Sequence, residues 1–182
     1  MTPRQGQVVM VAGRSGSQKS GFALYWVAAM GLPTLYFSAD MAPFTAGVRL
    51  ASIATGMSSK EVEAMMGTTS GRAQIEQAAS SLPIELSFGS PITWEQVEDE
   101  LNAYVMLHNE YPKVVVFDNL MDFAGCESDY EAQMGVMQDV IAFARTTGAT
   151  VIVLHHASDK TLDAKSNPWK PPSRDQIKNG LS

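Results

Sequence analysis

The stretch that decides the fold is Gly13-Arg14-Ser15-Gly16-Ser17-Gln18-Lys19-Ser20 (GRSGSQKS). It follows a short apolar run at residues 7–12 (QVVMVA) and opens a helical pattern that begins at Lys19 and ends at Gly31. The stretch matches the P-loop pattern GxxxxGK[ST] at Gly13, Lys19 and Ser20. In such a loop, backbone N–H groups surround phosphate, the lysine neutralises its charge, and the hydroxyl holds Mg²⁺. Residues 13–20 are therefore predicted to bind nucleotide phosphates.

The loop departs from the pattern at Gln18, where a second glycine is expected. That glycine keeps side-chain bulk away from the phosphates or permits an unusual backbone angle. Gly16 and Ser17 lie just before Gln18 and can supply flexibility. We therefore predict a degenerate loop that still binds nucleotide, though more weakly.

Strands and helices alternate along the rest of the chain. Alternation of this kind predicts an α/β fold, a mostly parallel sheet with helices on both faces. The predicted strands lie at residues 34–38, 84–88, 113–117 and 150–154, and the predicted helices lie at 44–55, from 58 onward, 70–81, 93–108 and 130–147.

One domain is predicted for residues 1–156, and a polar loop or tail for residues 157–182. The tail contains Pro168, Pro171 and Pro172 and has no strand that closes the sheet. We therefore expect the chain to be truncated, without the C-terminal strands of this fold.

Composition limits the classes of protein that the chain can represent. It has 182 residues, 45% of them hydrophobic, and a net charge of −6, which suits one globular domain. The acidity argues against a broadly basic surface for nucleic acid, so DNA contact would need a local patch or a ring pore.

Cys126 is the single cysteine, which excludes an intramolecular disulfide and fits a reducing compartment. No apolar run or signal peptide predicts a membrane partner, so we expect a cytoplasmic protein.

Two acids follow predicted strands. Asp118 ends the most apolar strand, where a carboxylate together with Ser20 can hold Mg²⁺, or Mn²⁺ in its place. An Asp-Asn turn is the alternative for Asp118 and Asn119, and Asn119 and Asp122 are further helpers of the site. Asp40 follows the strand after the P-loop and is the candidate general base, with a helix N-cap as its alternative.

Two adjacent histidines, His155 and His156, leave the last predicted strand. Because neighbouring strand residues face opposite sides and no Cys or His cluster accompanies them, a zinc site is not expected. We predict that one of the two imidazoles senses the γ-phosphate while the other packs or bonds locally, with neutral burial as the alternative.

A longer motif, Phe37-Ser38-Ala39-Asp40-Met41 followed by GVRLASIATGMSSKEV, resembles the RecA-like ATPase core of DnaB-type replicative helicases. The resemblance covers residues 8–180 and points to small phage or plasmid members. It implies ATP with Mg²⁺ as ligands and the cytoplasm of a bacterium or phage-infected cell as the location. It also implies that His156 is the polar sensor, so the candidate catalytic residues are Lys19, Asp40 and His156. The family usually has glutamate at the position of Asp40, so the shorter side chain implies less effective positioning of water.

The resemblance also implies DNA as a partner. Lys178, Asn179 and Gly180 are placed like the family's DNA-contacting loop, which lines the pore of a hexameric ring. The function implied is a DNA-dependent ATPase that assembles with copies of itself and acts on single-stranded or branched DNA. Two alternatives stay open. One is a metal-dependent, structure-selective nuclease that reuses Asp40, Asp118 and Asp122. The other is a non-catalytic DNA-binding or helicase-loading accessory protein.

Overall fold

The computed structural model describes residues 3–126 and 130–157. Its elements follow the alternation that the sequence predicts, and three of them, β2, β3 and α6, have the predicted bounds. The elements in chain order are β1 (Val8–Gly13), α1 (Lys19–Met30), β2 (Thr34–Ser38), α2 (Pro43–Thr55), α3 (Ser59–Met66), α4 (Thr69–Ala79), β3 (Ile84–Phe88), α5 (Trp94–His108), β4 (Val114–Asp118), the 3₁₀ turn η1 (Leu120–Asp122), α6 (Tyr130–Thr147) and β5 (Thr150–His156).

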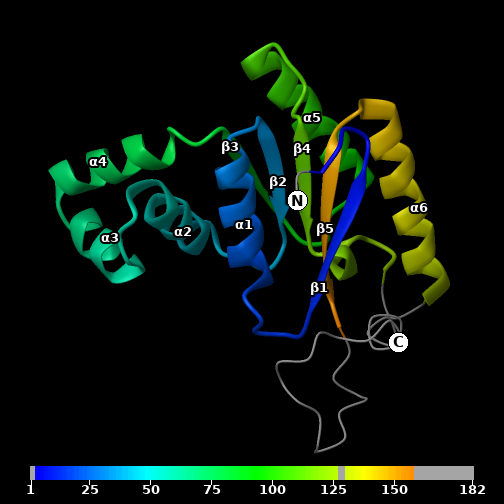
Figure 1. Cartoon of the computed structure of the whole chain (residues 1–182), viewed down its shortest axis with the longest axis horizontal. Coiled ribbons are helices and arrows are strands. Elements are labelled where there is room, and N and C mark those ends of the chain that lie inside the picture. The colour runs from blue at the N-terminus through cyan, green and yellow to red at the C-terminus, as the bar shows by residue number, and fades with distance from the viewer. Residues whose placement is uncertain (1–2, 127–129, 158–182) are drawn as a thin grey trace, which may run out of the picture.

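One five-stranded sheet in the order β1-β5-β4-β2-β3 forms the centre of the fold, and its strand pairs are all parallel (Figure 1). Because parallel strands end at the same edge of a sheet, the ends of β1, β2, β4 and β5 lie together. The register places Ser38 opposite Asp118 and Gly13 opposite His156. Residues far apart in sequence therefore meet at one edge, where a nucleotide-binding site is expected in such sheets.

Helices cover both faces of the sheet, as predicted. One core cluster joins one face of the sheet to α5 and α6, and a second joins the other face to α1 and α2. The central strands β2 and β4 are buried throughout because both of their faces are covered. A third, smaller cluster joins α2, α3 and α4, which extend away from the sheet at the left of Figure 1. Its buried members are Val48, Ala51, Val62 and Ile75.

Side-chain caps explain where two of the helices begin. Ser58 and Glu61 form a capping box at the start of α3, in the helical stretch predicted from residue 58 onward. Thr93 accepts a hydrogen bond from the backbone N–H of Gln96 and caps α5, whose first helical residue is Trp94. The prediction for β5 was two residues short, because its pairing with β1 continues to His156.

The division into a domain at residues 1–156 and a tail at residues 157–182 stays a prediction, since the tail beyond Ala157 lies outside the described residues. Within the described residues, no helix has the length and apolar character needed to cross a membrane.

Candidate nucleotide-binding site

The loop between β1 and α1 depends on glycine at two positions. At Gly13, a Cβ atom would lie 2.6 Å from the Ser17 Oγ and 3.3 Å from the Lys19 side chain, too close unless these side chains shift. Gly16 has a φ of 74°, a left-handed conformation that favours glycine. These two residues allow the chain to fold tightly ahead of α1.

Gln18 stands where the pattern expects glycine, and it adopts a glycine-like conformation. Its φ of 61° and ψ of 29° lie in the left-handed region, at the N-cap of α1, and its side chain makes no capping hydrogen bond. For a residue with a Cβ atom this conformation costs roughly 1–2 kcal/mol. Gln18 therefore adopts, at this cost, a conformation that glycine adopts freely.

We expect Gln18→Gly to tighten ATP binding. Glycine would relieve the backbone strain and remove side-chain bulk from the pocket, while its greater freedom in the unfolded chain opposes the gain in stability. The free energy of unfolding should therefore change by less than about 1 kcal/mol. Fluorescent ATP titration would measure the fall in Kd, and urea unfolding would measure stability.

Asn109→Gly is the matched control for that substitution. Asn109, at the C-cap of α5, is the other non-glycine residue with positive φ in the described part of the chain, and it does not line the pocket. Its replacement should leave the Kd for ATP unchanged. Equal Kd values for the Gln18→Gly variant and the wild type would contradict an obstructive role for Gln18.

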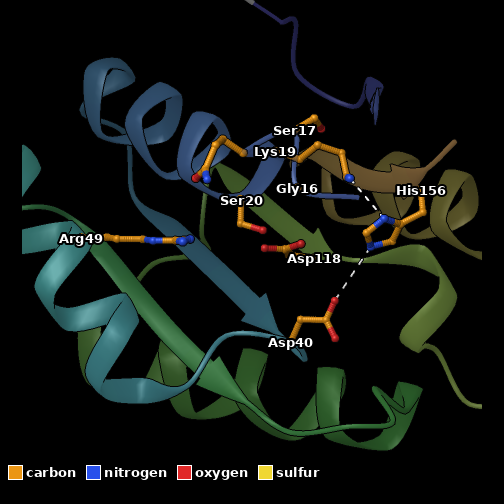
Figure 2. A pocket seen from close by; sticks show the side chains of 9 residues that line it. Gly16, Ser17, Lys19, Ser20, Asp40, Arg49, Asp118 and His156 are labelled. Atoms are coloured by element: carbon orange, nitrogen blue, oxygen red, sulfur yellow. Dashed lines mark hydrogen bonds and ion pairs between the residues drawn. The ribbon is translucent and has the colours of Figure 1, made fainter. Parts of the chain in front are cut away.

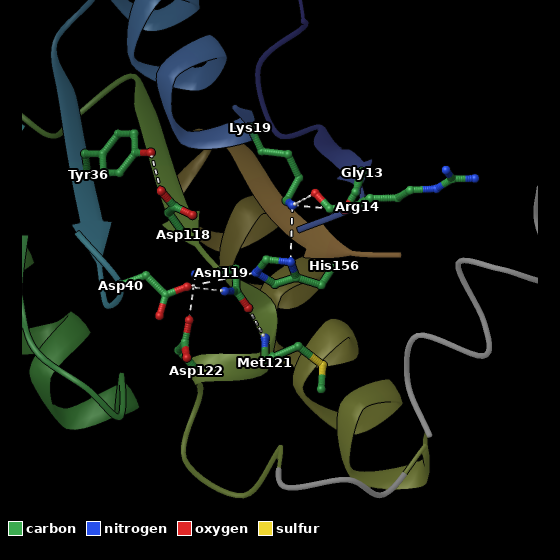
Figure 3. A network of polar contacts seen from close by, with 10 residues as sticks. All are labelled: Gly13, Arg14, Lys19, Tyr36, Asp40, Asp118, Asn119, Met121, Asp122 and His156. Carbon is green, nitrogen blue, oxygen red and sulfur yellow. Dashed lines mark hydrogen bonds and ion pairs between the residues drawn. The ribbon is translucent and has the colours of Figure 1, made fainter. Parts of the chain in front are cut away.

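Lys19 turns its ammonium group back toward the loop (Figure 3). Its Nζ donates to the carbonyl oxygens of Gly13 and Arg14, each at 2.9 Å, and lies 3.2 Å from the Nδ1 of His156. Because an ammonium group only donates, Nδ1 must accept, which places the proton of a neutral His156 ring on Nε2. Lys19 and His156 are thus brought together, as a shared phosphate site requires.

Asp118 ends β4 and is buried, with 3% of its surface exposed. The hydroxyl of Tyr36, on β2, donates a 2.7 Å hydrogen bond to its Oδ2. Burial, then the charge of Asp118 and this hydrogen bond, raise the pKa of Tyr36 well above its usual value. The hydroxyl therefore keeps its proton and remains a donor.

The carboxylate of Asp40 contacts Asn119 and His156 and does not cap a helix. Its Oδ2 accepts from the Nδ2 of Asn119 at 3.2 Å and lies 3.9 Å from the Nε2 of His156. The N-cap of α2 is Ala42, so the alternative of Asp40 as a helix cap is wrong. Its side chain stays 62% exposed, which leaves it open to solvent.

The residues after Asp118 have the turn-forming role considered for the Asp-Asn pair. Asn119 accepts from the N–H of Met121 at 2.8 Å, and Asp122 accepts from the N–H of Asn119 at 3.2 Å, which caps η1. Partial burial raises the pKa of Asp122, and the charges of Asp40 and Asp118 raise it further. The hydrogen bond from the backbone of Asn119 lowers this pKa but does not cancel the rise. The turn is thus formed by Asn119 and Asp122, while Asp118 itself lines the pocket.

A cavity of about 170 Å³ brings the loop and the strand ends together (Figure 2). Most of the candidate residues line it, whereas Gly13, Arg14 and Ser15 do not. The lining consists of Gly16, Ser17, Gln18, Lys19, Ser20, Asp40, Arg49, Asp118 and His156. The candidate DNA-binding residues Lys178, Asn179 and Gly180 lie outside the described residues.

Arg49 is the pocket residue that the sequence analysis missed. It lies on α2, its Nη1 is 3.4 Å from the Sδ of Met41, and Figure 2 shows its guanidinium group directed toward Ser20 and Asp118. A single arginine in a helical stretch matches no known motif, so its role could not be read from the sequence. The signal that could have pointed to the pocket was its place in the stretch GVRL, nine residues after the candidate base Asp40.

Comparison with known sequences gives two kinds of match. A family model described as "AAA domain" matches residues 3–161. The chain is also similar to two proteins named "Gene 65 protein". That of Mycobacterium phage L5 is 30% identical over 168 residues, which cover 85% of this chain and 59% of the relative. That of Mycobacterium phage D29 is 29% identical over 155 residues, which cover 83% of this chain and 67% of the relative. The chain thus spans between about half and two thirds of these relatives.

Solved structures are similar over nearly the whole chain. A structure described as an ATPase domain gives a TM-score of 0.77 at 15% identity, and the match covers 98% of this chain and 66% of that one. A DnaB-like replicative helicase, described with its interactions with primase, gives a TM-score of 0.76 at 14% identity. That match covers 96% of this chain and 44% of the helicase chain. The predicted RecA-like architecture is therefore confirmed.

Proposed function

The chain belongs to the AAA domain family, and from this premise we propose that it binds ATP with Mg²⁺ and hydrolyses it in a reaction coupled to DNA. The observation that carries the proposal is one pocket at the N-terminus of α1 that is lined by Lys19, Ser20 and Asp118. A helix N-terminus, a lysine and backbone N–H groups favour phosphate. A hydroxyl and a carboxylate beside them favour a divalent cation.

The donor set fits Mg²⁺. Ser20 and Asp118 supply hard oxygen atoms, and Mg²⁺ is commonly held by one or two such groups together with phosphate oxygens and water. Mn²⁺ accepts the same ligands. When bound, the ion would neutralise charge on the phosphates. Lys19 would bind the β- and γ-phosphates after its Nζ leaves the carbonyl oxygens of Gly13 and Arg14.

Three further residues have proposed roles around the γ-phosphate. Asp40 is the proposed general base, since its exposed carboxylate can accept a proton from a water molecule, and Asn119 orients it. His156, between Lys19 and Asp40, is the proposed sensor. Arg49 adds a positive charge to the pocket that would bind phosphate oxygens. Together they would stabilise charge and position water.

Coupling to DNA is the less direct part of the proposal. It is supported by the similarity in fold to a DnaB-like replicative helicase. Lys178, Asn179 and Gly180 are the proposed DNA contacts, and single-stranded or branched DNA is the proposed substrate. We further propose assembly into a homo-oligomer such as a hexameric ring, acting in the cytoplasm of the host cell. A ring lets an acidic protein present a basic pore to DNA.

The direct test measures phosphate release with ATP, with Mg²⁺ or EDTA, and with no DNA, single-stranded DNA or branched DNA. We expect hydrolysis that requires Mg²⁺ and rises severalfold with single-stranded DNA. Asp118→Asn should lower the rate by at least about 100-fold, since one well-placed electrostatic group contributes this much to catalysis. Asp99→Asn, on the exposed face of α5, is the matched control and should keep the wild-type rate.

Other outcomes would favour the rival functions. Metal-dependent cutting of branched DNA without ATP would indicate the nuclease, and the absence of both activities would indicate a non-catalytic accessory protein. The contacts of Asp122 support the ATPase over the nuclease. Its carboxylate accepts from the backbone N–H of Asn119 and caps the turn η1, so it is already used within the chain.

A further inference from the structure

The hydrogen bond between Tyr36 and Asp118 joins the apolar core to the nucleotide pocket. Tyr36 is the middle residue of β2, it is fully buried, and its ring packs in the cluster shared by the sheet with α1 and α2. From there its hydroxyl reaches across to the Oδ2 of Asp118 on the neighbouring strand, at 2.7 Å (Figure 3). Tyr36 does not line the pocket, but through this hydrogen bond it contacts Asp118, which does.

The position of Tyr36 does not by itself call for a hydroxyl group. Its ring lies in an apolar cluster that includes Leu24, Val116 and Leu154, and a buried hydroxyl is costly unless it finds a partner. The partner here is a carboxylate, and hydrogen bonds from O–H to a charged oxygen are short and strong. The bond also supplies Asp118 with a donor in a place where water has little access.

We propose that Tyr36 is a positioning residue for the metal site: it holds the carboxylate of Asp118 through Oδ2 and so directs Oδ1 toward a Mg²⁺ ion beside Ser20. The inference rests on the proposed function, because it assigns Asp118 to the ion. Groups that orient a metal ligand in this way typically contribute 10- to 100-fold to metal affinity. Tyr36 touches neither ATP nor the ion, so its effect passes entirely through Asp118.

Tyr36→Phe isolates the hydroxyl, since the ring and its packing remain. We expect the variant to require at least about 10-fold more Mg²⁺ for half-maximal binding of a fluorescent ATP analogue. Binding of the same analogue in EDTA should not change, because the backbone N–H groups and Lys19 are untouched. Circular dichroism and urea unfolding would confirm that the variant folds.

Tyr104→Phe is the matched control. Tyr104 is also a buried tyrosine, at 5% exposure, but it lies on α5, where its ring contacts His108, and it does not line the pocket. Removal of its hydroxyl should leave the Mg²⁺ requirement at the wild-type value.

A double-mutant cycle with Asp118→Ala separates positioning from a general effect on the fold. If Tyr36 acts through the carboxylate, Tyr36→Phe should cause no further change in Mg²⁺ dependence once Asp118 is alanine, which has no acceptor for the hydroxyl. Equal effects in both backgrounds would overturn the inference, as would an unchanged or lower Mg²⁺ requirement in Tyr36→Phe alone. If the wild type itself binds ATP without regard to Mg²⁺, the proposed metal site fails and the role of Tyr36 fails with it.

Discussion

Lys19→Ala should lower the rate of ATP hydrolysis by at least about 100-fold, because it removes the positive charge that the proposed mechanism places on the β- and γ-phosphates. The ammonium group is within hydrogen-bonding distance of the loop carbonyl oxygens and of His156, so it already lies in the pocket. Among the described residues, no other lysine lines the pocket, and Arg49 reaches it from α2 rather than from the loop. ATP binding should weaken as well.

The fold of the Lys19→Ala variant should remain intact. The carbonyl oxygen of Gly13 also accepts from the N–H of Ala157 at 3.0 Å, so it keeps a partner when the lysine is removed. Single-turnover and steady-state phosphate release would measure the loss, and circular dichroism the fold. Lys60→Ala, an exposed lysine on α3, controls for the change in net charge and should hydrolyse ATP normally. Wild-type turnover by the Lys19→Ala variant would remove the P-loop from the mechanism.

Phe117→Ala should lower the free energy of unfolding by about 3–5 kcal/mol, the usual range for a large aromatic residue replaced in a packed core. Phe117 is fully buried in β4, the residue before Asp118. Its ring is stacked on Phe37 at 5.3 Å between centroids. Further rings meet it edge-on, at 5.0 Å for Phe123 and at 6.1 Å for both Trp94 and Phe143.

Urea unfolding followed by circular dichroism would measure this loss. Phe44→Ala is the matched control, because Phe44 is 60% exposed at the start of α2. Its replacement should change the free energy of unfolding by less than about 1 kcal/mol. A similar loss in both variants would show that the ring cluster around Phe117 is not the main support of β4.

The sequence predicted the fold well because its signals are local. The apolar run before Gly13, the helix after it and the alternation of later strands and helices are each read from consecutive residues. The positions of Lys19, Ser20, Asp40, Asp118 and His156 in one pocket follow from parallel strands that end at one edge of the sheet. That arrangement was expected once the sheet was predicted.

Contacts made by side chains across the sheet could not be predicted in this way. The hydroxyl of Tyr36 and the carboxylate of Asp118 are 82 residues apart, and nothing local to either shows that β2 pairs with β4. Arg49 enters the pocket only because α2 packs against the same face as α1. The conformation of Gln18 also depends on its surroundings, since glutamine rarely adopts positive φ.

The small helical unit of α2, α3 and α4 has a consequence for motion. Its buried cluster is much smaller than the two that flank the sheet, so local opening there should cost less free energy than unfolding of the sheet. Helix α2 contributes both to that cluster and to the nucleotide pocket, since Val48 lies in the cluster and the adjacent Arg49 lines the pocket. A phosphate held by Arg49 would therefore make the helical unit harder to open, and slower amide exchange in α3 and α4 would report an occupied pocket from a distance.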